Sequence, residues 1–352
     1  MIISGIGGMM DFPAGIIKSV QQFSIVLDSG QTSDTATITD VVTANSYIHW
    51  GGEVCAVTTA GANRAFADVT LTNTTTVTAT RGSSTEAVTV YGTVVEFKVG
   101  IIQSIQQGQI TIGSGSTSNT ATINSVTTNN AFVHFNGQDG TSAAGTPEYI
   151  CGHFVLTNAT TVTFTRASST TSTPAGRFVV VEFVSGILNS NAQPFSISLT
   201  GASNTATITS VTTGASMVIW GGHTDSATTA IYGTGWPRAT LTDATTVTAT
   251  RNAVSNTTVL KGTVIEFKPA YIKSINRGNI ALTGVNTNTA TITAVNTSKS
   301  IASYLGYSTT DATEVFQENY NSIVLTNTTT VTASNNTATT TLTASYEIVE
   351  FN

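Results

Sequence analysis

Along much of the chain, apolar and polar residues alternate one by one, which is the period of a β-strand with one buried face. In TVTATR, Val77 and Ala79 are expected on one side of such a strand and the threonines on the other. Threonine is β-branched and suits a pleated surface, where its hydroxyl can face water. In the first part of the chain this pattern predicts six strands, at Ile17–Leu27, Thr35–Val42, Tyr47–Trp50, Ala67–Leu71, Thr75–Arg81 and Val88–Phe97. Thr72-Asn73-Thr74 predicts a turn, and no stretch of ten residues shows a helical period.

The phrase LTNTTTVTATR recurs four times. Its copies begin at Leu71, Leu156, Leu241 and Leu325, so the steps are 85, 85 and 84 residues. Three further phrases keep the same order: an opening IIKSV, then TATI, and a closing VVEF. Four markers in one order indicate four tandem copies of one unit.

The length of the unit bears on the architecture. Solenoid and propeller repeats run about 20 to 50 residues, whereas a unit of about 85 residues is long enough to hold a small core of its own. We therefore predict an all-β chain of four tandem small antiparallel β-sandwich domains, immunoglobulin-like in general shape but without the cysteine-tryptophan-cysteine signature. The predicted parts are an N-terminal arm at 1–15 and sandwich repeats at 16–98, 99–184, 185–268 and 269–352.

Two details qualify this picture. The joins between units are about three residues long, which predicts a stiff or folded-back array rather than domains on flexible linkers.

The third unit departs from the pattern at ILNSNAQPF, where a proline and a missing glycine weaken the prediction of its first strand.

Composition excludes several classes of protein. Charged residues make up 9% of the chain and the net charge is −6, so no basic field is present to hold nucleic acid or an anionic membrane. No apolar run is long enough for a membrane helix, and the start of the chain is not a secretory signal as written. Cys55 and Cys151 occupy different places in the repeat, which predicts free thiols in a reducing compartment.

The sequence contains no convincing catalytic, cofactor-binding or metal site, and we predict that the protein is not an enzyme. His49 and His134 are equivalent, but the third unit has Ile219 there and the fourth a residue near Tyr304, so a structural role is expected. His223 and Asp225 lack a matching third group for a metal or a triad. The chain also lacks the aspartate-rich loop of a calcium site.

The segments that follow the third predicted strand differ from unit to unit. Loops on a rigid scaffold often carry recognition, although exposed loops also diverge freely. In GTGWPR, Trp236 and Arg238 are the candidate partner-binding residues, because tryptophan and arginine concentrate interface energy.

A repeated arginine and a repeated glutamate predict an ion pair between strands. Arg81, Arg166 and Arg251 each close one strand, and Glu96, Glu182 and Glu266 each precede the last phenylalanine of another. The alternative is an ordinary solvated charge at a strand edge.

Units of the form IKSIQxGxI, TATITxV, a variable loop, LTNxTTVTATR and a closing VVEF resemble repeated domains in structural proteins of tailed bacteriophages, over residues 16–352. The resemblance implies a virion structural protein, made in the bacterial host cytoplasm, that decorates the capsid or forms another part of the virion surface. Its implied partners are other capsid or tail subunits and further copies of itself. The alternative is a tail fibre or adhesin that binds host surface glycans; ice binding is a more distant one, disfavoured by the long loops.

Overall fold

A computed structural model of the chain describes residues 15–56, 65–140, 146–228, 235–252, 256–310, 318, 320–339 and 341–352. The predicted N-terminal arm, apart from Gly15, lies outside these residues, as do the central parts of the four variable segments.

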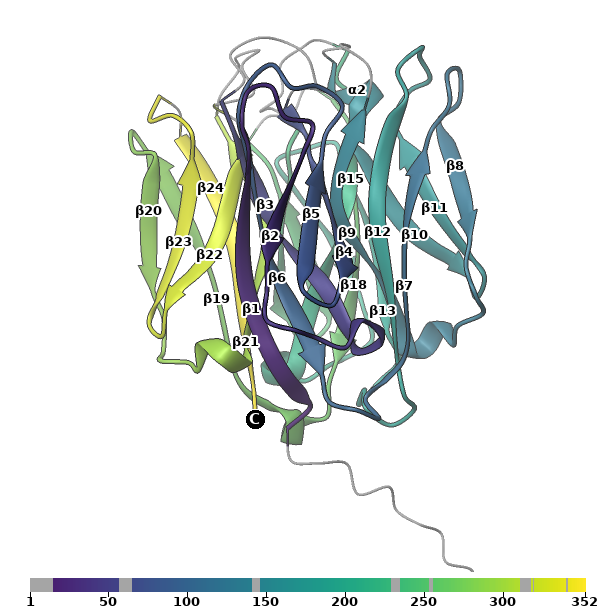
Figure 1. Cartoon of the computed structure of the whole chain (residues 1–352), viewed down its shortest axis with the longest axis vertical. Helices are drawn as coiled ribbons and strands as arrows, with labels where there is room; N and C mark the ends of the chain where they lie inside the picture. Colours follow the sequence, from purple (N-terminus) through teal and green to yellow (C-terminus); the bar gives the residue numbers. More distant parts are fainter. Residues whose placement is uncertain are drawn as a thin grey trace, which may run out of the picture.

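Each repeat contributes six strands, most of which are labelled in Figure 1. The first repeat holds β1 (Ile17–Leu27), β2 (Ser33–Thr37), β3 (Ser46–Cys55), β4 (Asp68–Asn73), β5 (Thr76–Thr80) and β6 (Val88–Phe97). The second holds β7 (Ile102–Thr111), β8 (Ser118–Thr122), β9 (Ala131–Gly140), β10 (Gly152–Asn158), β11 (Thr161–Arg166) and β12 (Pro174–Phe183). The third holds β13 (Gln193–Leu199), β14 (Ser203–Thr207), β15 (Ser216–Asp225), β16 (Arg238–Asp243), β17 (Thr246–Thr250) and β18 (Thr258–Glu266). The fourth holds β19 (Ile272–Thr283), β20 (Thr287–Thr291), β21 (Ser300–Thr309), β22 (Asn321–Asn327), β23 (Thr330–Asn335) and β24 (Thr341–Phe351).

Helical structure in the described residues is confined to short pieces. They are α2 (Pro147–Ile150) and the 3-10 turns η1 (Thr43–Asn45), η2 (Thr128–Asn130), η3 (Thr213–Ala215), η4 (Pro269–Tyr271) and η5 (Thr297–Lys299). None of the helices in the described ranges has the length and apolarity to cross a bilayer. The first strand of the third repeat, β13, has 7 residues against 10 to 12 in the other repeats, in line with the departure at ILNSNAQPF.

The prediction of an all-β, sandwich-like chain is confirmed, but the prediction of separate immunoglobulin-like domains is wrong. Every sheet has six strands and takes three of them from one repeat and three from the next. For example, β7, β12 and β9 of the second repeat continue into β4, β5 and β2 of the first. A repeat therefore cannot complete either of its sheets alone.

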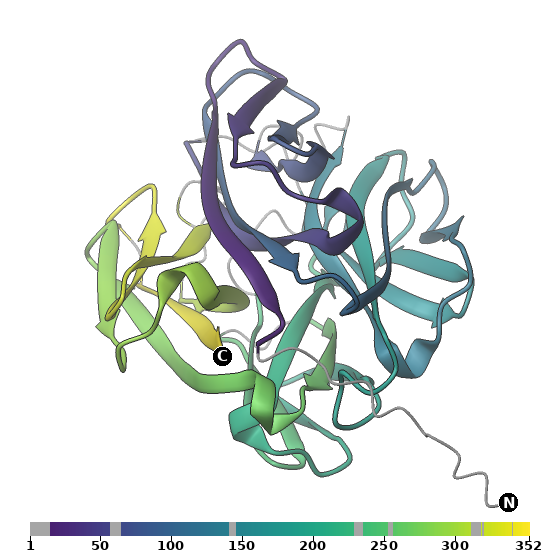
Figure 2. The ribbon, with the colours of Figure 1, turned by 60° about the horizontal axis from the view of Figure 1, so that its bottom comes forward.

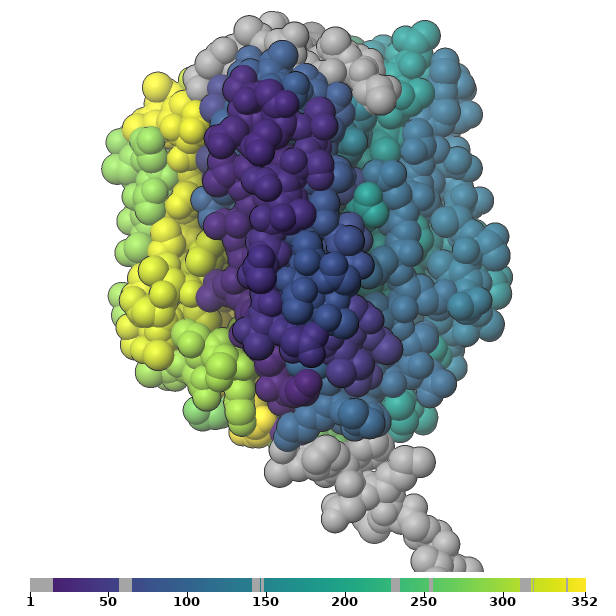
Figure 3. Space-filling view, viewed as in Figure 1, coloured from purple at the N-terminus to yellow at the C-terminus, as the bar shows by residue number. Residues whose placement is uncertain are grey.

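The sharing of strands closes into a ring. The sheet of β1, β6 and β3 is completed by β22, β23 and β20, so the fourth repeat pairs with the first. The four sheets stand around a central axis as the blades of a propeller, with the fourth repeat beside the first (Figures 2 and 3). A repeat of about 85 residues is longer than an ordinary propeller repeat because each blade here has six strands.

One glycine makes each junction between repeats possible. Gly52, Gly137, Gly222 and Gly306 lie at a bulge in the third strand of each repeat and have φ between 82° and 98°. Each pairs with the start of the fourth strand of the preceding repeat. A Cβ atom on Gly52 would lie 2.3 Å from the carbonyl oxygen of Asn321, so only glycine allows the two backbones to approach.

The threonine-rich phrase forms a hairpin, as predicted. In β5, Val77 and Ala79 are buried and the alternating threonines are more exposed. Asn73 accepts a hydrogen bond from the backbone N–H of Thr75 at 2.9 Å, which fixes the turn. The same turn bond occurs at Asn158, Asp243 and Asn327. The phrase therefore recurs because it encodes a complete local unit.

The closing VVEF phrase builds the axis of the ring. Phe97, Phe183, Phe267 and Phe351 are buried, and consecutive rings meet edge to face with centroids 5.3 to 5.5 Å apart. The glutamate before each phenylalanine accepts a hydrogen bond from the N–H just before a 3-10 turn, as Glu96 does from Val42 at 2.8 Å. The same bond joins Glu182 to Thr127, Glu266 to Thr212 and Glu350 to Asn296.

The first and last strands of each repeat place one aromatic ring opposite one glycine, in alternating orientation. In the first and third repeats the ring is on the first strand, as Phe23 opposite Gly92 and Phe195 opposite Gly262. In the second and fourth it is on the last strand, as Phe178 opposite Gly108 and Tyr346 opposite Gly278. A Cβ atom on Gly92 would lie 2.6 Å from the Phe23 ring, so each site holds one ring only.

Candidate functional site

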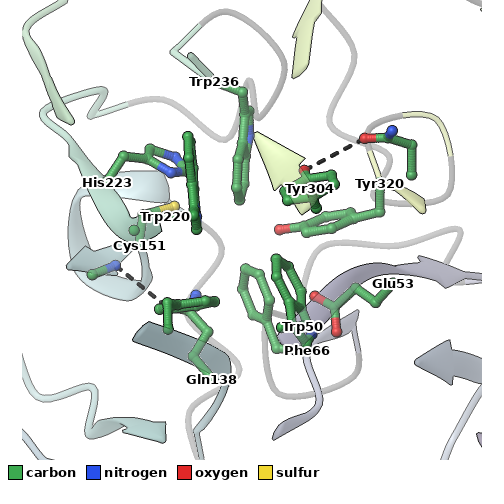
Figure 4. Close-up of a pocket in the computed structure, with 14 residues that line it drawn as sticks. Trp50, Glu53, Phe66, Gln138, Cys151, Trp220, His223, Trp236, Tyr304 and Tyr320 are labelled. Atoms are coloured by element: carbon green, nitrogen blue, oxygen red, sulfur yellow. Dashed lines mark hydrogen bonds between the residues drawn. The ribbon is translucent and has the colours of Figure 1, made fainter. Parts of the chain in front are cut away.

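The central axis contains an aromatic cavity to which all four repeats contribute (Figure 4). Its volume is about 20 Å³, which is room for about one water molecule. The lining residues come from three equivalent positions of the repeat. They are Trp50, Phe135, Trp220 and Tyr304; Glu53, Gln138 and His223; and Phe66, Cys151, Trp236 and Tyr320, together with Gly152, Gly222 and Asn321.

The first set lies just before the junction glycine and forms an aromatic belt. The ring of Trp50 is 5.3 Å from Phe135 and 5.1 Å from Tyr304, and Trp220 is 6.0 Å from Tyr304. These edge-on contacts join different repeats, because the third strands of neighbouring repeats contact one another.

The second set follows the junction glycine and supports the start of the fourth strand. Glu53 accepts a hydrogen bond from the N–H of Ala67 at 3.0 Å, and Gln138 accepts one from Gly152 at 3.3 Å. In the third repeat the corresponding residue is Pro237, which has no N–H, and a ring occupies the position instead: His223 packs edge-on against Trp236 at 4.3 Å. The first two repeats thus bond this residue to the start of the next strand, whereas the third and fourth place a ring there, His223 and Tyr307.

The electrostatics of the cavity favour neutral groups. Burial raises the pKa of the Glu53 carboxyl well above its ordinary value, against the opposing bond from Ala67. Burial likewise raises the pKa of the Cys151 thiol and lowers that of His223 to about 3. Near neutral pH, Cys151 is a thiol rather than a thiolate nucleophile and His223 is uncharged. This cavity is built for packing rather than for activating a nucleophile.

Of the two predicted partner-binding residues, one is buried at the axis and the other reaches a neighbouring repeat. Trp236 is 8% exposed and lies over the axis, stacked on Tyr307 at 5.5 Å. Arg238 begins β16 and reaches the fourth repeat, donating to the Ser308 hydroxyl and to the side-chain amide oxygen of Asn279, each at 3.1 Å. Both residues join repeats within the ring; their role toward another molecule stays a prediction.

All four histidines are buried. His49 and His134 contact each other across the axis, with ring centroids 4.3 Å apart, and Ile219 and Ser303 occupy the equivalent positions. Burial lowers the pKa of His134 to about 4 and that of His153 to about 3. No group of three His, Cys, Asp or Glu residues suited to a metal ion occurs in the part of the chain that the structure describes.

The predicted ion pair between the repeated arginines and glutamates is wrong. The arginines are buried and bond to loop carbonyls instead: Arg81 donates to Gln31 and Asp28, Arg166 to Ser116 and Ser172, and Arg251 to Gly201. The glutamates lie near the 3-10 turns, and Glu96 pairs with Lys18 instead. Strand alternation did not reveal that the arginine ends or follows a strand of one sheet while the glutamate lies on a strand of another.

The signal that sequence reasoning missed is the alignment of the repeats at positions 50, 53 and 66. Aromatic residues recur at these places in several repeats, and the structure brings them together at the axis. Comparison with known proteins gives no further identification: no family model matches the chain, and no curated protein matches it either.

Proposed function

We propose that the protein is a non-enzymatic structural component of a virion surface, most simply one that decorates the capsid and presents variable segments from a rigid ring. The observation that carries the proposal is the convergence of the residues that flank those segments. Phe66, Cys151, Trp236 and Tyr320 meet around one cavity. The ring therefore brings the described ends of the four diverged segments together.

Three features support a scaffold rather than a catalyst. The axis is filled by side chains, and the cavity of about 20 Å³ is too small for an organic substrate. The first and fourth repeats share one sheet, which closes the ring. The sequence phrases that resemble phage structural repeats form the hairpins and the axis of this scaffold.

The opposite end of the ring carries the ends of the described chain. Gly15 lies against the carbonyl of Asn352, and the C-terminus lies at the end away from α2 in Figure 1. The residues that flank the variable segments and the ends of the described chain thus lie at opposite ends of the molecule.

Antibody labelling of purified particles, followed by imaging, tests the proposal. Label distributed over the capsid is the expected result, and label at the tail tip together with binding on a glycan array would favour the adhesin alternative. Absence of the protein from purified particles would refute a virion role of either kind.

A further inference from the structure

Side chains from the first strand clamp three of the four junctions between repeats. Gln22 donates to the carbonyl of Leu325 at 2.8 Å and accepts from its N–H at 3.2 Å. Gln107 makes the same two bonds to Leu71, at 3.3 and 3.2 Å. Two residues that face each other in an antiparallel sheet exchange this same pair of bonds, so each glutamine imitates a neighbouring strand. In the fourth repeat Arg277 takes this place and donates to backbone carbonyls of the third repeat.

The junction between the second and third repeats lacks such a clamp. By strand register, Pro194 occupies the place of Gln22 and Gln107, and its ring carries no hydrogen-bonding group. Leu156 is the equivalent of Leu71, and no side chain bonds to its backbone within the described residues. The pair of backbone bonds that a glutamine makes at two other junctions is therefore missing here.

The same junction carries a positive charge without a counter-charge. At the junction of the first and second repeats, Arg177 of β12 pairs with the buried Asp68 of β4 at 2.7 Å. Lys261 of β18 and His153 of β10 occupy these two places one repeat further on. Burial, and then the charge of Lys261, lowers the pKa of His153 to about 3, so near neutral pH this histidine is uncharged. Lys261 forms no ion pair in the described part of the chain, and the place of the Asp68 carboxylate is taken by a neutral ring.

A groove of about 360 Å³, which both Leu156 and Lys261 line, lies at this junction. The corresponding groove between the fourth and first repeats, which includes Gln22, measures about 210 Å³. The described lining of the larger groove includes the apolar rings of Phe132 and Phe154 and contains no carboxylate. An apolar surface, an unpaired cation and a strand edge thus meet in one groove.

We propose that this groove binds a short extended segment of a partner protein that carries an acidic side chain. β10 pairs with β15 only where His153 meets Gly222, so its edge beyond that point is open to an added strand. One residue of the segment exchanges the pair of backbone bonds with Leu156, an acidic side chain pairs with Lys261, and apolar side chains cover the floor. That the partner is a neighbouring virion subunit rests on the function proposed above, whereas the chemistry of the segment rests on the groove alone.

A peptide of simple composition tests the proposal. A fluorescent heptapeptide that alternates valine and aspartate, with both ends blocked, is titrated into the purified full chain and followed by anisotropy. We expect binding that weakens about tenfold or more in Pro194→Gln, which supplies the clamp, and about fivefold in Lys261→Gln. Lys18→Gln removes a lysine outside the groove, so it is the matched control and should leave the affinity unchanged. No binding at peptide concentrations up to about 1 mM, or equal binding by the parent and Pro194→Gln, would overturn the proposal.

Changes in the peptide identify what the groove recognises. Replacing aspartate by asparagine keeps the shape and should weaken binding about fivefold. N-methylation of the peptide amides keeps the charge and should abolish binding, because the methylated backbone cannot pair with a strand edge. Binding of the N-methylated peptide, or of an acidic polysaccharide in its place, would show recognition of charge alone and refute strand addition.

Hydrogen exchange locates the bound peptide. The backbone amide of Leu156 should exchange at least about tenfold more slowly with saturating peptide, while the amide of Leu71, which Gln107 already holds, should not change. Binding without protection at Leu156 contradicts the proposal. These measurements use purified protein, so they can succeed or fail independently of the antibody labelling that tests the virion role.

Discussion

Phe23 and Gly92 face each other across a strand pair, and exchanging the two residues tests whether the site needs one ring and no more. Phe23 is 8% exposed and covers Gly92. Phe23→Gly removes a buried ring, and its expected cost is about 4 kcal/mol, mostly from the cavity left behind. Gly92→Phe alone places a second ring where a Cβ atom would already lie 2.6 Å from Phe23, so overpacking of about 1–3 kcal/mol or more is expected.

The double variant should recover most of this loss, because it reproduces the orientation that Phe178 and Gly108 show in the second repeat. We expect its unfolding free energy within about 1.5 kcal/mol of the parent, so the coupling between the two sites is about 3 kcal/mol or larger. Guanidinium unfolding of the parent, both single variants and the double variant measures this coupling. The reverse exchange at Phe178 and Gly108 is the matched control. If the double variant lost the sum of the two single effects, the one-ring explanation would be refuted.

Three further predictions concern the axis and the loops. The pKa of His134 is about 4 in the folded chain, below its ordinary 6.5, so the unfolded chain takes up this proton first and stability is lost as the pH falls from about 6.5 towards 4. His134→Ile, the residue of the third repeat, should flatten the pH profile of the unfolding free energy by up to about 3 kcal/mol at pH 4, and parallel profiles would contradict this. Arg166→Lys should lower the free energy of unfolding, measured with a chemical denaturant, by about 2–4 kcal/mol, because it leaves loop carbonyls unpaired. Lys18→Gln, at an exposed ion pair, is the control and should lower it by less than about 1 kcal/mol. Similar losses in the two variants would show that burial of the guanidinium is unimportant. Phe183→Ala should cost about 3–5 kcal/mol, while Val99→Ala, at an 84% exposed position, should change the midpoint little; a small effect at Phe183 would exclude the phenylalanines of the axis as its main support.

The local structure could be predicted from the sequence because it depends on nearby residues. Alternation in TVTATR determines which side of the strand is buried, and Asn73 closes its own turn within two residues. The first predicted strand matches β1 at both ends, and the sixth matches β6. The second prediction ran on to Val42, but β2 ends at Thr37; the residues beyond it precede the turn η1.

The candidate site could not be predicted in the same way, because its residues are brought together by contacts across repeats. Trp236 looks like an exposed anchor in GTGWPR, but it is buried against Tyr307 of the next repeat. The arginine and glutamate of each repeat seemed suited to pair, yet Arg166 and Glu182 have separate partners. Periodicity places a residue on one face of a strand and does not say which other strand covers that face.

The sequence by itself determined the strands, the hairpins, the four repeats and the absence of long helices in the part of the chain now described. Those features rest on alternation, turn residues and internal similarity, which are all local or periodic. Only the tertiary structure decided that repeats share their sheets and that the fourth closes on the first. Sharing depends on backbone pairing at the junction glycines, such as Gly52 with Ser322, between residues far apart in the chain. A strand alternates apolar and polar residues in the same way whether the strand it pairs with belongs to its own repeat or to the next. The sequence pattern therefore does not show which of the two it pairs with.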